Sequence, residues 1–195
     1  LHDGGIEFSM TPAVAPTFAG DAAAAAALIM QSAAKAGSFE ITLYEKTPIG
    51  NGNQANNPWL QEVPDPVSKV VWDNYITMSP KQMKELGFET FQEQRAMADV
   101  VEVTVNGVTL RAPVFPQPGQ VYGTVGLALG YGRTKAGKCG NIGSNAYSFV
   151  GNTNGTLSYT SFDAKIGASV DKYSLASTQT HHTLMGRNMV KEASL

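Results

Sequence analysis

The sequence predicts a mainly β domain with a few short helices, and three observations support this fold class. Residues 99–114, DVVEVTVNGVTLRAPV, have apolar side chains at every second position on both sides of Asn106-Gly107, which favours a two-residue type I′ hairpin. Residues 38–46, SFEITLYEK, alternate between apolar and polar side chains as a half-buried strand does. Helix signals are short, as in SPKQMKELG at residues 79–87, where a serine cap and a proline open the helix and a glycine ends it.

The first part of the chain predicts a linker followed by one helix. Residues 1–20 contain prolines and glycines and are expected to be extended. Asp21 is expected to cap an alanine-rich helix that stops at Gly37. Leu28 and Ile29 give this helix an apolar side, so we expect it to pack on another surface.

Loops and further strands are expected in the rest of the chain. Residues 47–58, TPIGNGNQANNP, contain too much Gly, Asn and Pro for regular structure. The polar segment 88–96 either extends the helix before it or is an insertion. Pro113 restricts the end of its strand to a sheet edge or a bulge. Strands are also predicted at residues 70–78, 121–132, 156–164 and 168–178.

Composition excludes several classes of protein. The chain has 195 residues, 43% of them hydrophobic and only 15% charged, which suggests faces covered by other parts of a larger protein. The net charge of −2 gives no indication of binding to nucleic acid or to an anionic membrane. A single cysteine excludes an intrachain disulfide and an all-cysteine metal site. No apolar run reaches about 18 residues, so no membrane span is expected, and the start at Leu1 predicts a piece of a longer polypeptide.

The glycine-rich segment at residues 130–147, GYGRTKAGKCGNIGSNAY, resembles a phosphate-binding P-loop but departs from it. A P-loop needs a hydroxyl residue after its lysine, and this chain has Cys139 after Lys138. A P-loop also opens a helix, whereas the following GNIGSNAY is poor helix material. We therefore expect no nucleotide at this segment and no helix directly after Lys138.

The strand before this segment has one bulky face and one nearly bare face. Every second residue of its bare face is glycine or alanine, which allows another backbone or a flat ligand to approach closely. Two interpretations remain open, namely tight strand crossing inside a small barrel and contact with an extended cofactor. The bare face consists of Gly126, Ala128, Gly130 and Gly132.

Several segments, in this order, resemble the C-terminal dinucleotide-binding domain of molybdopterin oxidoreductases of the DMSO reductase type. The matching segments are NNPWLQEVPDP (56–66), ITMSPKQMKELGF (76–88), ADVVEVTVNG (98–107), PGQVYGTVGLALGYGR (118–133) and GSNAY (143–147). Ala98 stands where that family usually has glycine. The resemblance implies a six-stranded double-psi β-barrel with a few short helices.

A narrower resemblance is to the large iron–sulfur subunit of bacterial alternative complex III, a respiratory assembly that oxidises quinol. Residues 55–75, 125–147 and 177–195 carry it. It implies residues 1–38 as linker and helix, 39–176 as the barrel, and 177–195 as a junction to a ferredoxin-like portion that holds the iron–sulfur clusters. It also implies a location on the periplasmic side of the inner membrane, with the rest of the chain and other subunits of the complex as partners.

Two loops are the candidate cofactor site under this resemblance. In cofactor-bearing relatives they approach the molybdopterin guanine dinucleotide, and short polar side chains suit a guanine or phosphate edge. The same side chains could equally serve only to hold irregular loops together, which is what we expect if the closest relatives lack the cofactor. The candidate residues are Asn53, Gln54, Asn56 and Asn57 in the first loop and Ser144 and Asn145 in the second.

Other candidates for chemistry are weaker. Adjacent residues such as His181 and His182 point in opposite directions in a strand, so we expect packing at a junction and no metal site. Cys139 beside Lys138 could be reactive, although a lone cysteine is usually incidental. No catalytic set is recognised, and no cofactor is expected within this stretch. The sequence therefore predicts a non-catalytic scaffold of an oxidoreductase, the alternative being a domain that grips the dinucleotide of an active molybdenum enzyme.

Overall fold

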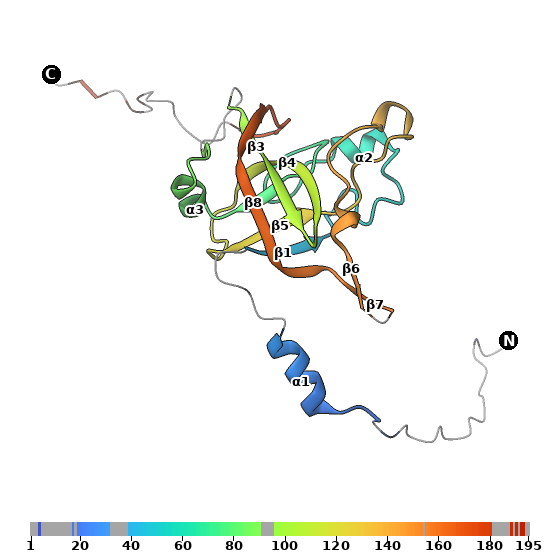
Figure 1. The fold of residues 1–195 in the computed structure, drawn as a ribbon. Coiled ribbons are helices and arrows are strands. Elements are labelled where there is room, and N and C mark those ends of the chain that lie inside the picture. The colour runs from blue at the N-terminus through green and yellow to red at the C-terminus, as the bar shows by residue number, and fades with distance from the viewer. Residues whose placement is uncertain are drawn as a thin grey trace. The chain divides into compact units, whose positions relative to one another are not determined.

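The computed structural model describes residues 19–31, 39–90, 96–153 and 155–180, together with positions 4, 17, 188, 190, 192 and 193. The chain divides into two compact units, Leu1–Ala33 and Ala34–Leu195 (Figure 1). The strands all belong to the second unit. The two units are therefore described separately.

The first unit contains the predicted alanine-rich helix, α1 (Ala22–Gln31). The Oδ1 atom of Asp21 accepts hydrogen bonds from the amides of Ala23 (2.8 Å) and Ala24 (3.2 Å), so the predicted cap is confirmed. Leu28 and Ile29 are exposed within this unit. The predicted end of the helix at Gly37 lies outside the described residues.

In the second unit, strands β3 (Ala98–Val105) and β4 (Val108–Pro116) form the predicted hairpin. Its turn has positive φ at both central positions, 49° at Asn106 and 81° at Gly107, as a type I′ turn requires. Strand β4 does not end at Pro113, because it continues to Pro116 and changes partner. It pairs with β3 up to Pro113 and then, from Val114, runs parallel to another strand.

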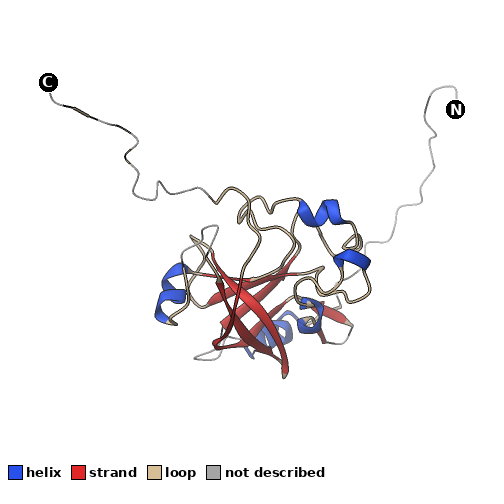
Figure 2. Cartoon of the chain, turned by 90° about the horizontal axis from the view of Figure 1, so that it is seen from above, coloured by secondary structure: helices blue, strands red, loops and turns tan. Residues whose placement is uncertain are grey.

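Six strands close into a barrel in the order β1-β5-β2-β4-β3-β8 (Figures 1 and 2). The closed six-stranded ring with a few short helices confirms the predicted fold class. The four strands not yet described are β1 (Phe39–Tyr44), β2 (Ile76–Met78), β5 (Thr124–Ala128) and β8 (Thr160–Tyr173).

The connections of this barrel cross in two equivalent places. The chain runs from β1 to β2 across β5, which lies between them, and from β4 to β5 across β2. Accordingly β1 and β5 are parallel, as are β2 and β4, whereas the other four neighbouring pairs are antiparallel. If β1, β2 and β3 are exchanged with β4, β5 and β8 respectively, the order of strands around the ring stays the same. Each crossing forces a long connection over a neighbouring strand, and this is the pattern that the double-psi prediction requires.

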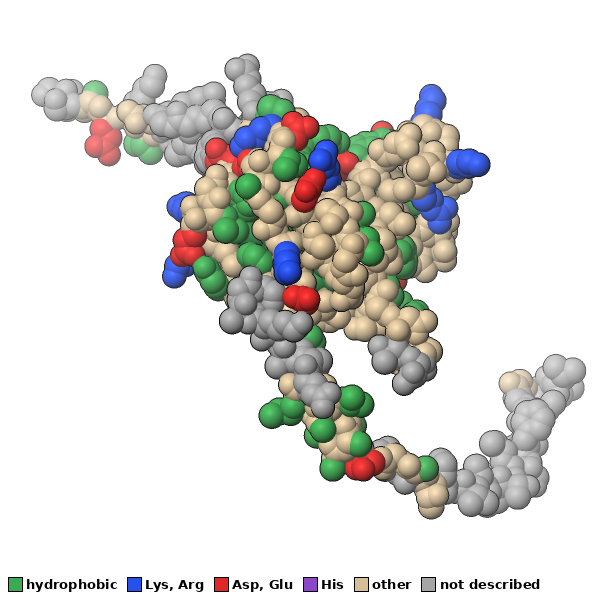
Figure 3. Space-filling model, viewed as in Figure 1, with side chains coloured by type: hydrophobic (Ala, Val, Ile, Leu, Met, Phe, Trp, Pro, Cys, Tyr) green, Lys and Arg blue, Asp and Glu red, His purple; other side chains and the backbone are tan. Residues whose placement is uncertain are grey.

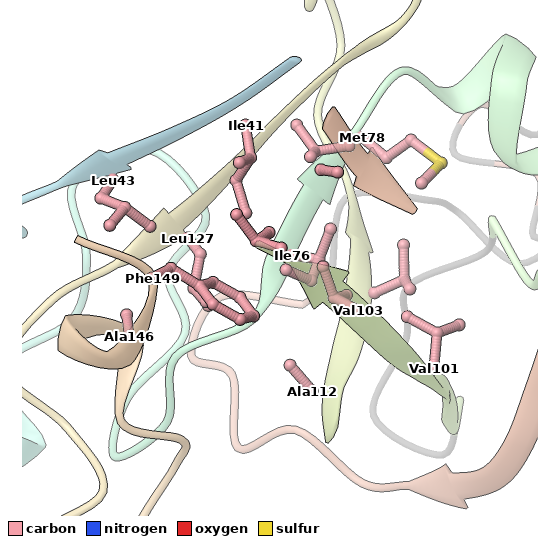
Figure 4. Packing of buried hydrophobic residues seen from close by; sticks show 14 of the residues in the cluster. Ile41, Leu43, Ile76, Met78, Val101, Val103, Ala112, Leu127, Ala146 and Phe149 are labelled. Carbon is pink, nitrogen blue, oxygen red and sulfur yellow. The ribbon is translucent and has the colours of Figure 1, made fainter. Parts of the chain in front are cut away.

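The inside of the barrel is filled by aliphatic side chains from all six strands (Figure 4). The alternation predicted for the hairpin is confirmed, since Val101, Val103 and Val105 are fully buried. Met83 and Phe88 close the cluster from the segment after β2. Burial of this kind stabilises a domain by about 25 cal/mol for each Å² of apolar surface removed from water, so this cluster is the main source of stability.

Short helices and one small hairpin decorate the barrel. They are α2 (Pro58–Glu62), α3 (Pro80–Glu85), the 3-10 turns η1 (Gly137–Cys139) and η2 (Ala146–Phe149), and the hairpin of β6 (Gly151–Thr153) and β7 (Thr156–Ser158). Helix α3 ends at the predicted glycine. The amide of Phe88 donates to the carbonyl of Met83 (2.8 Å) across Gly87, whose φ is 77°. The segment that begins at Phe88 therefore does not extend α3 through residue 90.

Several predicted strands differ in length from the observed ones. Of residues 70–78 only the last three form a strand, because Trp72 has a positive φ of 69° and the chain turns there. Of residues 121–132 only Thr124–Ala128 are strand, and Gly130 then takes a φ of 90°. The predicted strand at 156–164 divides between β7 and β8, and β8 continues to Tyr173. Within the described residues, no helix is long and apolar enough to cross a membrane.

Candidate functional site

The two candidate loops meet beside the end of β5. We call this region the loop junction, defined as residues 49–57, 128–135 and 140–147 together with Asn74. At its centre the backbones of Gly52 and Gly130 touch, since a Cβ atom on Gly52 would lie 2.6 Å from the Cα atom of Gly130. A Cβ atom on Gly130 would lie 2.8 Å from the side chain of Ile49. Such distances exclude any side chain at either position.

Two further glycines of the bare face also lie in close contact with other segments of the chain. A Cβ atom on Gly126 would lie 2.7 Å from the hydroxyl oxygen of Thr77, and one on Gly132 would lie 2.8 Å from the Cα atom of Asn145. The amide of Gly132 donates to the carbonyl of Ile142 (2.8 Å), which fixes the closing loop against the strand exit. Close approach of protein segments therefore accounts for Gly126, Gly130 and Gly132, as the barrel interpretation predicts.

Asn74 holds the loop junction together from inside, and sequence reasoning missed it. Its side chain is fully buried, and its amide nitrogen donates to the carbonyls of Ala128 (2.8 Å) and Ser144 (2.8 Å). Its Oδ1 atom accepts from the amide of Ser144 (2.8 Å). The one signal in the sequence is the polar pair Asp73-Asn74 within the otherwise apolar segment 70–78. All the hydrogen-bonding capacity of Asn74 but one lone pair is used within the protein.

The predicted site residues of the closing loop have structural partners. Asn145 caps η2 by accepting a hydrogen bond from the amide of Tyr147 (3.2 Å). The hydroxyl of Ser144 donates to the carbonyl of Arg111, while Asn74 holds its backbone. These contacts fix the loop from two sides, so neither side chain is free of a role in the fold.

Of the predicted site residues in the first loop, one side chain has a structural role and three are exposed. Asn57 caps α2 by accepting from the amide of Trp59 (3.0 Å), and its own amide donates to the carbonyl of Gln54 (2.9 Å). The amide of Asn53 donates to the Oδ1 atom of Asn51 (3.0 Å). The side chains of Asn53, Gln54 and Asn56 are exposed.

Two adjoining hollows open at the loop junction. The first, of about 400 Å³, lies where the two loops meet and is lined by Asn51, Gly52, Arg133, Lys135, Asn145 and Tyr147 among others. The second, of about 520 Å³, is lined by Asn56 and by the loop of Arg133, Lys135 and Lys138. We call the two hollows together the basic cleft. Of the predicted site residues, the structure brings only Asn56 and Asn145 to the cleft.

The P-loop alternative is not supported by the geometry. Lys138 lies in the single 3-10 turn η1, and the residue after Cys139 turns back toward Gly137. The amide of Asn141 donates to the carbonyl of Arg133 (2.6 Å), which closes this segment into a compact loop. No helix begins after Lys138, as expected from the composition of the segment. Cys139 itself is 4% exposed and packs inside this loop, so the alternative of a reactive thiol is not favoured.

Two buried ionisable residues, Lys46 and Asp73, lie next to the loop junction. The Nζ atom of Lys46 donates to the carbonyl of Asp73 (3.0 Å) and lies 3.9 Å from the centre of the Tyr75 ring. Burial lowers the pKa of Lys46 to about 8, although Asp65 and Asp73 act in the opposite direction. Burial also raises the pKa of Asp73, against a hydrogen bond from the Tyr173 hydroxyl (2.9 Å). Sequence reasoning missed this pair as well.

Metal ligation finds no support in the described part of the chain. No group of three or more His, Cys, Asp or Glu side chains comes together among those residues. His181 and His182 lie outside the described residues, so their predicted packing role stays a prediction. The comparison with protein families gives no match for this chain, and no curated protein matches it.

Proposed function

We propose that this barrel is a non-catalytic scaffold and interface domain of the iron–sulfur subunit of a respiratory quinol oxidoreductase of the alternative complex III type. The segment resemblance supports the parent. The scaffold role is supported chiefly by one observation, namely that three of the six predicted polar positions of the two loops serve the fold. Asn57 and Asn145 cap helices, and Asn74 and Arg111 hold Ser144.

In this role the barrel orients its neighbours and carries no electrons itself. Four glycines let its segments pack in close contact, which suits a spacer between other parts of an assembly. A low proportion of charge and exposed apolar side chains such as Trp59, which is 80% exposed, agree with faces that contact other proteins. The parent would hold its iron–sulfur clusters in a ferredoxin-like portion on the periplasmic side of the membrane.

Metal analysis of the intact parent, purified with its complex, tests this proposal. Iron without molybdenum is the expected result. Molybdenum at close to one atom per chain would overturn the proposal and identify an active molybdenum enzyme.

The second candidate is a domain that grips a molybdopterin guanine dinucleotide. It is favoured by the hollow of about 400 Å³ at the place where the two loops meet. Arg133, Lys135 and Asn145 are the side chains that would hold a pyrophosphate and a guanine edge there. The chemistry of such a cofactor would be oxygen-atom or electron transfer at its metal, and this chain would contribute only binding.

A further inference from the structure

The basic cleft concentrates positive charge in one short loop. Arg133, Lys135 and Lys138 are all exposed. Across the described residues, the ion pairs are those of Arg111 with Glu102 and of Lys172 with Asp99, so these three cations have no acidic partner. In the space-filling view, basic side chains gather over the loop beside α2, apart from the acidic side chains of that face (Figure 3). The charge of this loop is therefore available to a binding partner.

Contacts between the two loops also support the cleft. Its two hollows share Arg133 and Lys135 in their linings, so both lie against the same loop. The hydroxyl of Tyr147 donates to the carbonyl of Asn51 (2.7 Å) and ties the two loops together across it. Gly52 and Gly130 pack against each other in the lining of the first hollow, too closely for a side chain at either position. Cations that line two hollows suit a segment with several carboxylates better than a single compact ion.

The charge of the whole chain selects among anionic partners. There are 16 acidic and 14 basic residues, so the chain as a whole has no excess of positive charge to hold an extended polyanion along its surface. Nucleic acid or an anionic bilayer would extend beyond the cleft, whereas a short acidic peptide segment would contact the three cations alone.

We infer that the basic cleft is the docking site for a short acidic segment of a partner protein, with its carboxylates paired to Arg133, Lys135 and Lys138. The inference rests on the proposed interface role and names the chemistry of one of its partners. It is nevertheless measured separately, because metal content tests the parent and peptide binding tests the cleft.

The test measures binding of a fluorescein-labelled octaglutamate peptide to the full chain by fluorescence anisotropy at low and at physiological salt. R133A/K135A/K138A is compared with K81A/K84A/K165A, which removes three exposed cations elsewhere and gives the same net charge. We expect the cleft variant to bind about tenfold more weakly, because three exposed ion pairs are lost and this fold-change corresponds to about 1.4 kcal/mol for the three together. The control variant should lose less than about twofold, and binding should weaken as salt rises.

Three results would overturn the inference. They are absence of binding at low salt, equal loss in both triple variants, and displacement of the peptide by guanosine diphosphate or by an eight-residue oligothymidylate at lower concentration than by unlabelled octaglutamate. Displacement by the nucleotide would assign the cleft to the second candidate function. Near-ultraviolet circular dichroism of both variants establishes that each is folded.

Discussion

The β3–β4 hairpin and the loop junction use similar residues in opposite ways. In the hairpin, Asn106 and Gly107 provide a turn between strands that pair residue by residue from Val105 with Val108 onward. In the loop junction, asparagine and glycine join segments far apart in the chain. Asn74 bonds to residues 54 and 70 positions away. The partners of the hairpin are its neighbours in sequence, whereas those of the junction are set by the fold.

This difference shows where a glycine or asparagine can be replaced. Gly107 would place a new Cβ atom in open space, so only its backbone conformation matters. Gly130 has both a φ of 90° and backbone atoms of another loop within 3 Å of a new Cβ atom. Positive φ alone therefore does not measure the importance of a glycine. What makes a glycine important is whether atoms from a distant part of the chain lie where its side chain would be.

The largest expected effect is that of Gly130→Ala. A Cβ atom there would lie 2.9 Å from the amide nitrogen of Gly52, and the φ of 90° is strained for alanine. We expect a loss of about 3 to 5 kcal/mol in the free energy of unfolding, measured with urea. Gly119→Ala, at a φ of 83° with nothing within 4 Å, should cost only about 1 kcal/mol. Equal losses would show that the two loops do not touch.

Asn74→Ala is expected to cause the second largest loss of stability. It removes three hydrogen bonds and leaves the amide of Ser144 and the carbonyl of Ala128 without their partner in a buried site. We expect a loss of about 3 kcal/mol in urea unfolding. The exposed Asn53 offers the matched control, because Asn53→Ala should change stability by less than about 0.5 kcal/mol.

The pH dependence of stability tests the buried Lys46. Its pKa in the folded protein is lowered to about 8 from 10.5, so the unfolded chain binds more protons between these values and stability should rise with pH. We expect the stability of the wild type relative to Lys46→Met to rise by about 2 kcal/mol from pH 8 to pH 10, because the other titrating groups act alike in both proteins.

The buried tyrosines act in the opposite direction, from about pH 9 upward. The pKa of Tyr44 is raised to about 12, and those of Tyr75 and Tyr131 are raised further, all chiefly by burial. Because the unfolded tyrosines lose their protons first, stability should fall above pH 10 in the wild type and in Lys46→Met alike. A stability difference between the wild type and Lys46→Met that stays constant from pH 8 to pH 10 would contradict the burial of Lys46.

The smallest expected effect is that of Asn145→Ala, about 1 kcal/mol, because it removes one capping hydrogen bond to the amide of Tyr147. Asn145→Gly should cost only a few tenths of a kcal/mol, since glycine is tolerated at this position of a helix. Thermal unfolding of both variants is the measurement. If both retain full stability, the side chain of Asn145 is free for a ligand and the second candidate function gains support.

The elements that were predicted correctly have local causes. Asp21 caps its helix through amides two and three residues away, and Gly87 ends α3 through a bond across a single turn. The bare face of β5 was also recognised, together with its meaning as a place of close approach. The strand at 70–78 was overestimated because its apolar composition was mistaken for pairing, whereas Trp72 bends the chain.

The candidate site was predicted in part. Asn145 and Asn56 do line the basic cleft, but Asn51, Arg133 and Lys135 were not recognised as its lining. Arg133 and Lys135 were considered only within a P-loop that does not form. Their meeting with the first loop depends on a contact between Gly52 and Gly130, which no local pattern signals.

By itself, the sequence determined the hairpin, the start of α1, the end of α3 and the class of fold, because alternation, capping and turn chemistry act over a few residues. Only the tertiary structure decided the buried Lys46, the central role of Asn74 and the shape of the basic cleft. The physical reason is that a buried polar group is stable only with a partner. In a barrel whose connections cross, that partner comes from a distant part of the chain.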